Sequence, residues 1–489
     1  FTEIGKDVST LLHLYAYCRL KNLFLVFVSV LFNLTLSLWS KTKKKMLGKE
    51  TIFKNLGIES LTQMQLQMES CTRQEGGVVL LSPTGSGKTL AYLLPLIREI
   101  NAEIAALQAV VVVPTRELAQ QSEDVMKRMK TGLRSLSLYG GRPAMEEHRR
   151  IKEVKPQVVF ATPGRLNDHL SKGNLDSLLV RVVVIDEFDK CLELGFQEEM
   201  NQLLLQFRRA NRCWLTSATD AEEIPDFMSL LKMKFEKLNF LKQADELRER
   251  ISMKCVLSSE KDKLPALGRL LTLVGDAPTI VFVSYRESVD RVWKWLVSEG
   301  FSAVAYHGGM EQEFRERALY RFRSGSANVL VSTDLAARGL DIPEVRVVVH
   351  YHLPLKAEEF THRNGRTARW NAEGVIYLIQ GPTEHLPDYL EADEVEYEDL
   401  SAITSYKPAA PHYVTLYIGR GKRDKLSKSD VLGFFCKKGG LKAANIGRID
   451  IGSHYAYVAI ERVKVKEVLT RIANEKIKGM KTLIEVMRK

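Results

Sequence analysis

Short runs of apolar, mostly β-branched residues recur along the chain, and helix-like stretches separate them. In the first half they are Val78–Leu81, Val110–Val113, Val158–Ala161, Val182–Ile185 and Trp214–Thr216. The pattern then restarts with Thr279–Val283, Ala303–Tyr306, Val329–Val331, Val345–Val349 and Val375–Ile379. Strands that are apolar throughout and alternate with helices are typical of a parallel sheet covered on both faces. The sequence therefore predicts two α/β domains in tandem, with a hinge near Asn239–Arg250.

A glycine-rich stretch follows the first apolar run. Residues Ser82–Thr89 read SPTGSGKT, and the helix-like LAYLLPLIREI comes next. The stretch fits the pattern G-x-x-x-x-G-K-[ST] if Ser82 stands in place of the first glycine. Such a turn directs backbone N–H groups at phosphate oxygens, while Lys88 adds a charge and Thr89 a hydroxyl for magnesium. The sequence therefore predicts half of an ATP site at this turn.

Two further motifs carry groups suited to phosphoryl transfer. Residues 186–189 read DEFD and follow the fourth apolar run, where one carboxylate can hold magnesium through water and a second can polarise the attacking water. Residues His362–Arg369 read HRNGRTAR and supply three arginines for a transferring phosphoryl group. If these arginines complete the site only when two domains close, whatever closes the domains gates ATP hydrolysis.

The last part of the chain changes in pattern. An acidic stretch, Glu391–Asp399, and the proline-containing Lys407–Pro411 predict a linker. Beyond it we expect strand, helix, strand, strand, helix and strand at Val414–Ile418, Ser429–Lys437, Ile446–Ile451, Tyr455–Ile460, Val463–Ala473 and Met480–Met487. That βαββαβ order predicts a small ferredoxin-like module.

Positive charge is concentrated in this module. Tyr413–Lys489 holds 18 Lys and Arg against 7 Asp and Glu, while the rest of the chain holds 53 of each sign. Such concentration favours a surface that binds a polyanion over a diffusely basic surface. The six cysteines lie far apart without a C-x-x-C pair, which argues against a disulfide framework or zinc site and fits a reducing cytoplasm.

The first 45 residues differ from the rest. Leu23–Trp39 is apolar apart from four polar residues, and the basic run Lys41–Lys45 follows it. This length is at the short limit for a membrane span, and no cleavage site of signal-peptide type follows. Because the first methionine is Met46, we expect residues 1–45 to be translated upstream sequence, with a genuine anchor as the alternative. We expect a cytoplasmic monomer without a stable membrane partner.

The ordered set of motifs resembles that of DEAD-box RNA helicases. The matching segments span about residues 50–383 and are SPTGSGKT, PTRELA at 114–119, GG at 140–141, TPGR at 162–165, DEFD, SAT at 217–219, TD at 333–334, ARGLD at 337–341 and HRNGRTAR. The resemblance implies two RecA-like domains with ATP between them and single-stranded RNA across both. The expected boundaries are 46–240 and 241–383 for these domains, 384–411 for the linker and 412–489 for the C-terminal module.

The resemblance also implies roles for single residues at the ATP site. Lys88 and Thr89 are similar to phosphate and magnesium ligands, Asp186 to the magnesium carboxylate and Glu187 to the general base. Arg366 and Arg369 resemble arginine fingers. The residues implied to contact nucleotide are Gln65, Thr84, Gly85, Ser86, Gly87, Lys88, Thr89, Asp186, Gly339 and Asp341. The residues implied to couple hydrolysis to strand separation are Ser217 and Thr219, through Asp189.

The implied RNA contacts are arginines, hydroxyls and backbone amides, which bind phosphates without reading bases. In the first domain they are Thr115, Arg116, Gly141, Thr162, Gly164 and Arg165, and in the second His307, Gly308, Gln312, Arg315 and Thr333. The core is therefore expected to be blind to RNA sequence.

Three positions depart from the family pattern. Phe188 replaces the alanine of the DEAD motif, which retains the two catalytic carboxylates but places a ring beside Asp189. Ala368 replaces a usual glycine. In the adenine-reading segment Gln65 is present, but the upstream aromatic Phe53 stands closer than the family spacing, so Phe53 either stacks on adenine or belongs to the core.

The C-terminal module resembles the RNA-binding domain of DbpA-type DEAD-box helicases, which implies recognition of a hairpin in large-subunit ribosomal RNA. Tyr417, Tyr455 and Tyr457 are spaced to lie on one sheet face, where they either stack bases or pack. The basic loop offers Arg420, Lys422, Arg423 and Lys425 for phosphates, and a later group offers Lys476, Lys478 and Lys481.

These observations lead us to expect an ATP- and magnesium-dependent RNA helicase that acts on structured ribosomal RNA of the pre-ribosomal large subunit. An RNA-binding clamp or chaperone with weak ATPase activity is the alternative, given DEFD and the altered adenine segment. A DNA-translocating helicase is the less favoured third class.

Overall fold

The computed structural model describes residues 48–141, 143–219, 226–241, 251–337, 345–367, 374–390 and 395–487. The predicted residues Gly339, Asp341 and Arg369 lie outside these ranges, as does the apolar segment Leu23–Trp39. Among the described residues, no helix is both long and apolar enough to cross a membrane.

The chain divides into two compact units, of which the larger comprises Leu61–Met126 and Arg134–Lys489. The described residues of the smaller unit are 48–60 and 127–133. Its helix α3 (Lys49–Leu56) ends at Gly57, whose φ of 72° lies in the left-handed region that favours glycine. Within this unit the Asn55 side chain donates to the carbonyl of Met129 at 3.2 Å.

The first sheet of the larger unit is parallel and has the order β3-β4-β2-β5-β6-β1-β7. Its strands are β1 (Gly76–Leu81), β2 (Ala109–Val112), β3 (Ser135–Leu138), β4 (Val158–Ala161), β5 (Val182–Ile185), β6 (Arg212–Ser217) and β7 (Phe235–Asn239). The central strands are buried on both faces, as their unbroken apolar sequences predict.

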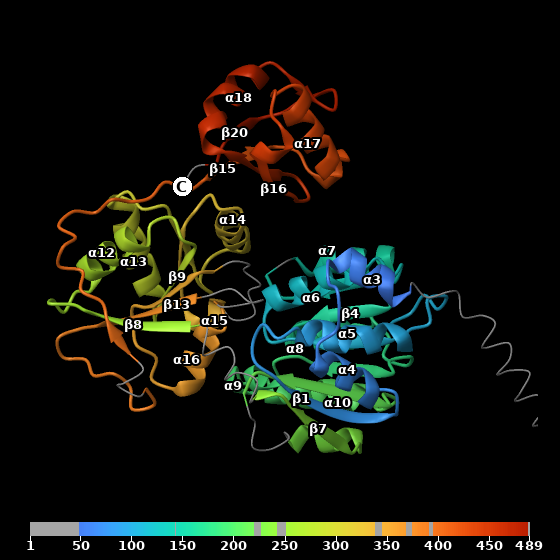
Figure 1. Cartoon of the computed structure of the whole chain (residues 1–489). Helices are drawn as coiled ribbons and strands as arrows, with labels where there is room; N and C mark the ends of the chain where they lie inside the picture. The colour runs from blue at the N-terminus through green and yellow to red at the C-terminus, as the bar shows by residue number, and fades with distance from the viewer. Residues whose placement is uncertain are drawn as a thin grey trace, which may run out of the picture. The chain divides into compact units, whose positions relative to one another are not determined.

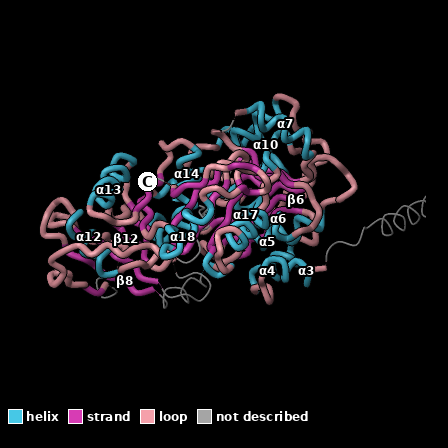
Figure 2. The backbone as a smooth tube through the Cα atoms, turned by 90° about the horizontal axis from the view of Figure 1, so that it is seen from above, coloured by secondary structure: helices cyan, strands magenta, loops and turns pink. Residues whose placement is uncertain are grey.

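Helices cover both faces of this sheet. They are α4 (Gln63–Cys71), α5 (Lys88–Glu99), α6 (Arg116–Met129), α7 (Ala144–Val154), α8 (Pro163–Ser171), α9 (Phe188–Glu193) and α10 (Gln197–Gln206), followed by the 3-10 turn η1 (Asp226–Leu231). Leu166 of α8 and Met200 of α10 pack on one face. Figure 2 shows α4 and α5 on the side of the strands away from α10.

The second sheet is also parallel, with the order β10-β11-β9-β12-β13-β8-β14. Its strands are β8 (Ile251–Leu257), β9 (Thr279–Phe282), β10 (Ala303–Tyr306), β11 (Val329–Ser332), β12 (Val347–His350), β13 (Gly374–Gln380) and β14 (Glu396–Tyr397). The helices are α12 (Leu264–Val274), α13 (Arg286–Ser298), α14 (Gln312–Arg323), α15 (Asp334–Ala337) and α16 (Ala357–Asn364). Figure 1 labels these five helices and, of the strands, β8, β9 and β13.

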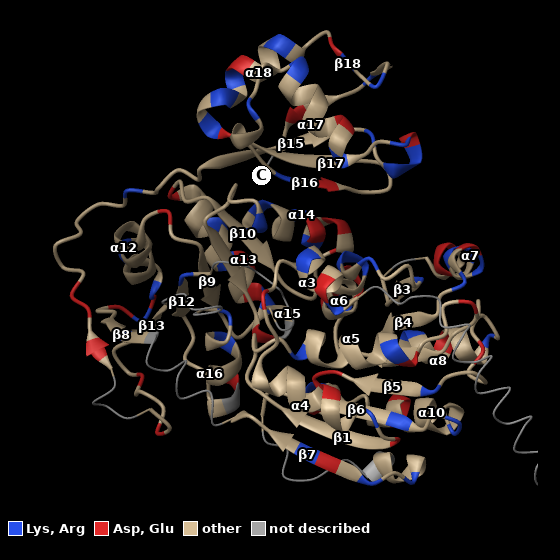
Figure 3. Ribbon diagram, turned by 45° about the vertical axis from the view of Figure 1, so that its right-hand side comes forward, with Lys and Arg blue, Asp and Glu red and all other residues tan. Residues whose placement is uncertain are grey.

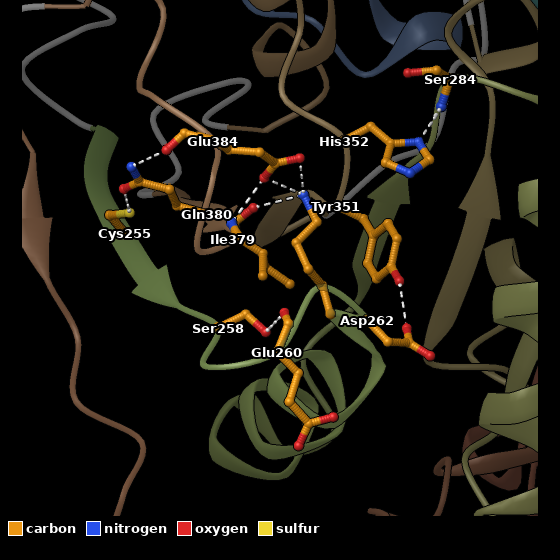
Figure 4. A network of polar contacts seen from close by, with 12 residues as sticks. Cys255, Ser258, Glu260, Asp262, Ser284, Tyr351, His352, Ile379, Gln380 and Glu384 are labelled. Atoms are coloured by element: carbon orange, nitrogen blue, oxygen red, sulfur yellow. Dashed lines mark hydrogen bonds and ion pairs between the residues drawn. The ribbon is translucent and has the colours of Figure 1, made fainter.

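A polar network fastens the segment after β13 to the start of α12 (Figure 4). The buried Lys263 donates to the carbonyl of Ile379 at 3.0 Å and pairs with the Glu384 carboxylate at 2.7 Å. Burial lowers the pKa of Lys263, and Glu384 acts in the opposite direction. Tyr351 donates to Asp262 at 3.4 Å. The network therefore belongs to the scaffold of the second sheet.

The C-terminal module has an antiparallel sheet in the order β16-β17-β15-β20. Its elements are β15 (Tyr413–Ile418), α17 (Lys428–Lys437), β16 (Ile446–Ile451), β17 (Ala456–Glu461), α18 (Val465–Ile472), the hairpin β18 (Lys476–Ile477) and β19 (Met480–Lys481), and β20 (Ile484–Val486). The predicted fold class is thereby confirmed. The prediction of one final strand over Met480–Met487 is wrong, because residues 480–481 pair within the hairpin and only 484–486 join the sheet.

Candidate functional site

The glycine-rich turn lies between β1 and the start of α5. Gly85 and Gly87 have φ of 84° and 91°, in the left-handed region where a side chain is strained. A Cβ added at Gly87 would also lie 2.6 Å from the amide nitrogen of Gln65. The Ser82 and Ser86 hydroxyls are 2.7 Å apart across the turn. Both glycines are therefore required by the local backbone.

Lys88 is held inside the turn. Its ammonium donates to the carbonyl of Ser82 at 2.5 Å and of Pro83 at 3.0 Å, and the side chain is 8% exposed. Burial lowers the pKa of Lys88, and the carboxylates of Asp186 and Glu187 partly oppose this effect. Lys88 thus places a buried positive charge beside two carboxylates.

Asp186 follows β5 and is buried. The Thr216 hydroxyl donates to Asp186 Oδ1, and the Tyr92 hydroxyl donates to Asp186 Oδ2 at 3.1 Å. Burial raises the pKa of Asp186, while the Thr216 hydrogen bond and the charge of Lys88 lower it. Donors to both oxygens fix the orientation of this carboxylate, as a group that holds a metal ion requires.

Glu187 is the only catalytic candidate in the described residues with a strained backbone. Its φ of 52° is left-handed, and its amide donates to the Thr216 hydroxyl at 3.4 Å. Burial, and then the Asp186 carboxylate, raise the pKa of Glu187, whereas Arg366 lowers it. A raised carboxylate pKa strengthens a general base.

Among the described arginines of the motif at 362–369, Arg366 acts on the charges of the ATP site. Arg366 is buried and its charge acts on both Lys88 and Glu187. A Cβ at Gly365 would lie 2.8 Å from the Cβ of Thr84 in the glycine-rich turn. The charge of Arg366 therefore acts at the ATP site, and its role as an arginine finger stays a prediction.

Arg363, the first arginine of the same motif, has a different place. Its guanidinium makes a bidentate pair with Asp334, at 2.5 and 2.7 Å, and donates to the carbonyl of His352 at 2.7 Å. Arg363 is 2% exposed. Of the three arginines that the motif offers, Arg363 is therefore held by Asp334, and it is not one of the implied arginine fingers.

The predicted coupling residues form one hydrogen-bonded group. The Thr219 hydroxyl donates to Asp189 Oδ2 at 2.8 Å, and the Thr219 amide donates to the Ser217 hydroxyl at 3.0 Å. Phe188 does not disturb this group, because its ring is 1% exposed and belongs to the core of the first sheet.

The predicted RNA residues of the first domain lie just after parallel strands. Thr115 accepts from the amide of Leu118 at 3.2 Å. Gly141 has a φ of 92°, and a Cβ there would lie 2.3 Å from the guanidinium of Arg116. Thr162 stands before α8, in whose first turn Gly164 is exposed.

Arg165 is oriented by a residue that the sequence does not single out. Its guanidinium pairs with the buried Glu147 at 3.1 Å. The same carboxylate contacts His169 at 3.0 Å and accepts from the amide of Tyr139 at 3.2 Å. No local signal reveals Glu147, because its role depends on contacts between three separate segments.

The predicted RNA residues of the second domain lie directly after β10, on α14 and at the end of β11. Gln312 accepts from Arg116 at 3.5 Å. Arg315 is buried, pairs with Glu117 at 2.6 Å and donates to the Tyr306 hydroxyl at 3.1 Å. Thr333 is buried, and its predicted RNA contact stays untested.

The segment predicted to read adenine contains a glutamine that hydrogen bonds hold in place. Gln65 and Thr62 form a reciprocal capping box at the start of α4, and the Gln65 amide nitrogen donates to the carbonyl of Gly87 at 3.3 Å. Phe53 is partly buried and belongs to the smaller unit. Its stacking on adenine stays a prediction.

The basic loop of the C-terminal module is partly structured by its own charges. Arg420 pairs with Asp424 at 2.9 Å, whereas Lys422, Arg423 and Lys425 are exposed. Lys478 of the β18–β19 hairpin donates to the carbonyl of Lys425 at 2.7 Å, so the two predicted basic groups are adjacent. Figure 3 shows further Lys and Arg on α18 and near β18.

Three family models match the chain. The model described as DEAD/DEAH box helicase matches residues 62–227, and that of the helicase conserved C-terminal domain matches residues 262–371. The model of the DbpA RNA binding domain matches residues 415–486.

Curated relatives and solved structures extend these matches. The ATP-dependent RNA helicase DbpA of Escherichia coli (strain K12) is 32% identical over 446 residues, which cover 90% of this chain and 97% of that protein. The DEAD-box ATP-dependent RNA helicase RhpA of Helicobacter pylori (strain B128) is 32% identical over 69% of either chain. The structure of S. cerevisiae Dbp5 bound to RNA and ADP BeF3 has a TM-score of 0.63 at 23% identity, over 73% of this chain and 95% of that chain, and supports the fold alone.

Proposed function

Because the chain belongs to the DEAD-box family of ATP-dependent RNA helicases and ends in a DbpA-type RNA-binding domain, we propose that it remodels large-subunit (23S) ribosomal RNA during ribosome assembly. The predicted family resemblance is confirmed, and with it RNA-dependent ATPase and helicase activity. The ribosomal target is supported by the match of residues 415–486 to the DbpA domain and by the concentration of positive charge there.

The residues at the ATP site fit a nucleotide with magnesium. We assign Lys88 to the phosphates, and Asp186, with Thr89, to magnesium. Bound magnesium would neutralise charge that develops on the phosphates. Glu187 accepts the proton of the attacking water, for which its raised pKa is suited. Arg366 stabilises negative charge in the transition state, as its action on Lys88 and Glu187 supports.

The residues assigned to RNA lie in both α/β domains, and this gives RNA a way to control hydrolysis. Arg116 and Arg165 in the first domain and Gln312 and Arg315 in the second are assigned to the RNA backbone. RNA that contacts both domains holds Arg366 near the nucleotide, and the group of Asp189, Ser217 and Thr219 links hydrolysis to strand release. Since phosphate contacts carry no sequence information, target choice falls to the C-terminal module.

The decisive experiment compares RNA activators of ATP hydrolysis. We expect a hairpin fragment of large-subunit ribosomal RNA to activate the full chain at lower concentration than random RNA of equal length. Lys422→Glu should reduce that preference and lower the salt slope of binding by about one to two. Lys294→Glu, an exposed charge reversal on α13, is the matched control. Equal activation by both RNAs would refute the ribosomal target.

Two further assignments accompany this function. We propose a monomer that associates with the pre-ribosomal large subunit, which sedimentation of cell extract at low and high salt would test. We also propose a cytoplasmic location, which rests on the family assignment and on the described cysteines, all of which are free thiols. Fractionation of native cells would test the location.

A further inference from the structure

A buried carboxylate lies between the segments that are assigned to RNA in the first domain. Glu147 belongs to α7, the helix that follows the glycine pair Gly140–Gly141, and it is 1% exposed. An ionised carboxylate at this depth is stable only if donors surround it. The role of Glu147 therefore follows from the groups that donate to it.

One oxygen of Glu147 holds the backbone next to the glycine pair. Its Oε1 accepts from the amide of Tyr139 at 3.2 Å, and Tyr139 directly precedes Gly140. Tyr139 is fully buried, and the Gln120 side chain of α6 donates to its hydroxyl. Helix α6 begins at Arg116, another residue assigned to RNA. The carboxylate is thereby connected to the glycine pair directly and to α6 through Tyr139.

The other oxygen of Glu147 faces α8. Its Oε2 lies 3.1 Å from Nε of Arg165 and 3.0 Å from Nε2 of His169, one turn later on the same helix. The side-chain nitrogen of Asn174 lies 3.1 Å from Nδ1 of His169. Because an amide nitrogen only donates, Nδ1 is the acceptor and the ring proton is on Nε2, which donates it to Glu147. His169 therefore holds the carboxylate without a positive charge.

These contacts fix the direction of the Arg165 guanidinium. With Nε directed at Glu147, an incoming phosphate meets the terminal nitrogens of the guanidinium. The side chain is 15% exposed, so most of it is packed against protein. A planar guanidinium that is already held loses less conformational freedom when it binds a phosphate. Arg165 is therefore preorganised for one direction of approach.

The charge of Glu147 and its contacts have opposite effects on RNA. Glu147 and the RNA backbone are both negative, so a purely electrostatic role predicts that neutralising Glu147 tightens RNA binding. A positioning role predicts weaker binding, because the guanidinium is then no longer held by a carboxylate. The sign of one measurement separates the two roles.

We propose that Glu147 is a positioning residue for RNA, which holds Arg165 and the glycine pair in one fixed arrangement along the RNA path. The carboxylate itself does not contact RNA. It lowers the RNA concentration that ATP hydrolysis requires and takes no part in the chemical step. The proposal rests on the proposed assignment of Arg165 and Gly141 to the RNA backbone, and it adds the group through which these separate motifs act together.

Glu147→Gln in the full chain tests the proposal, because it removes the charge and keeps the length of the side chain. We measure kcat at saturating RNA and the concentration of a short uridine homopolymer that gives half-maximal ATP hydrolysis, called the activation constant below. An unstructured strand is used because the C-terminal module is expected to prefer a hairpin. The activation constant should rise by about tenfold, the low end for one hydrogen bond to a charged group, with kcat within about twofold of the parent.

Glu153→Gln is the matched control. Glu153 is an exposed glutamate on the same helix, where it pairs with the exposed Arg149 at 3.4 Å. The substitution makes the same change of charge, and an exposed pair of this kind contributes little. The activation constant of Glu153→Gln should therefore stay within about twofold of the parent.

Variants of Arg165 show whether Glu147 acts through it. Arg165→Ala should raise the activation constant at least as much as Glu147→Gln. The double variant Glu147→Gln/Arg165→Ala should match Arg165→Ala within about twofold, because residues that act through one contact are not additive. Arg165→Lys keeps the charge but lacks the planar guanidinium, so it should resemble Glu147→Gln. It tests the same contact if thermal melting shows that Glu147→Gln does not fold.

The outcomes separate this proposal from the function on which it rests. An activation constant that falls or stays unchanged in Glu147→Gln would overturn the positioning role, provided that Arg165→Ala raises it. Additive effects in the double variant, or an Arg165→Lys variant that behaves as the parent, would overturn it as well. An unchanged activation constant in Arg165→Ala would instead refute the assignment of Arg165 to RNA, and the proposal would fall with it.

Discussion

Thr216→Val should impair catalysis through the two carboxylates that flank one hydroxyl. Thr216 is fully buried at the end of β6. Its hydroxyl donates to Asp186 and accepts from the amide of Glu187 at 3.4 Å. Valine retains the shape of threonine but lacks the hydroxyl, so the substitution leaves an ionised buried carboxylate with one donor fewer.

The size of the effect follows from the charge on Asp186. A hydrogen bond to an ionised group contributes about 1.5–3 kcal/mol, and each 1.36 kcal/mol is a factor of ten. If the hydrogen bond contributes this full free energy when magnesium and ATP are bound, its loss lowers kcat/KM by about 10-fold to 100-fold. The direction in which the pH profile of ATP hydrolysis shifts also follows from this hydrogen bond. Since the Thr216 hydrogen bond lowers the pKa of Asp186, its loss raises that pKa and moves the acid limb of the ATPase profile to higher pH.

The assay is steady-state ATP hydrolysis with saturating RNA, measured across pH and magnesium concentration. Thr216→Ser keeps the hydroxyl and should stay within about threefold of the parent, which separates the hydrogen bond from a packing loss of the size of one methyl group. Tyr92→Phe removes the other donor to Asp186 and should move the acid limb in the same direction. An unchanged acid limb and kcat/KM in Thr216→Val would refute the reasoning.

Three other predictions concern the same site. Glu187→Gln should retain ATP and RNA while hydrolysis falls about 100-fold or more, because the proton of the attacking water loses its acceptor; near-normal turnover would remove Glu187 from this role. Arg366→Ala should bind ATP almost normally but lose RNA-stimulated hydrolysis by about 10³-fold, the scale of an arginine finger, as single-turnover kinetics would measure. Arg363→Ala should lower the free energy of unfolding by about 3 kcal/mol, the low end for a broken buried pair because Asp334 is partly exposed. Thermal melts of Arg363→Ala and Arg363→Lys without nucleotide would measure this loss, and equal melting of Arg363→Ala and the parent would contradict it.

The sequence predicts the strands that are apolar throughout and misses the others. In the two α/β domains the missed strands are β3, with the sequence SLSL, β7, with FEKLN, β8, with ISMKCVL, and β14, which has only two residues. These strands exist because neighbouring strands offer them parallel partners. Pairing of this kind is a tertiary effect, which local propensity does not contain.

The residues of the candidate site also differ in whether the sequence alone reveals them. Groups within a motif, such as Lys88 and Asp186, are visible in the sequence because their spacing carries the chemistry. Glu147 and Thr216 are not visible, since each acts on residues from other segments of the chain. The resemblance assigns a role to Arg366 and none to Arg363. The fold adds that Arg363 pairs with Asp334 and that the charge of Arg366 acts on the ATP site.

The tyrosines of the C-terminal module show what a pattern leaves open. Alternation along β15 and β17 places Tyr417 and Tyr457 on one face, but it does not say what covers that face. The ring of Tyr320 packs against Tyr457 from more than a hundred residues earlier in the sequence. A buried aromatic face in an RNA-binding fold is therefore ambiguous from sequence alone.

Helix α14 connects the two surfaces assigned to RNA. Its first turn carries Gln312 and Arg315, which contact Arg116 and Glu117 of the first domain, and its last turns carry Tyr320, whose ring contacts Tyr457 of the C-terminal module. An α-helix rises 1.5 Å per residue, so the eight residues from Gln312 to Tyr320 correspond to about 12 Å.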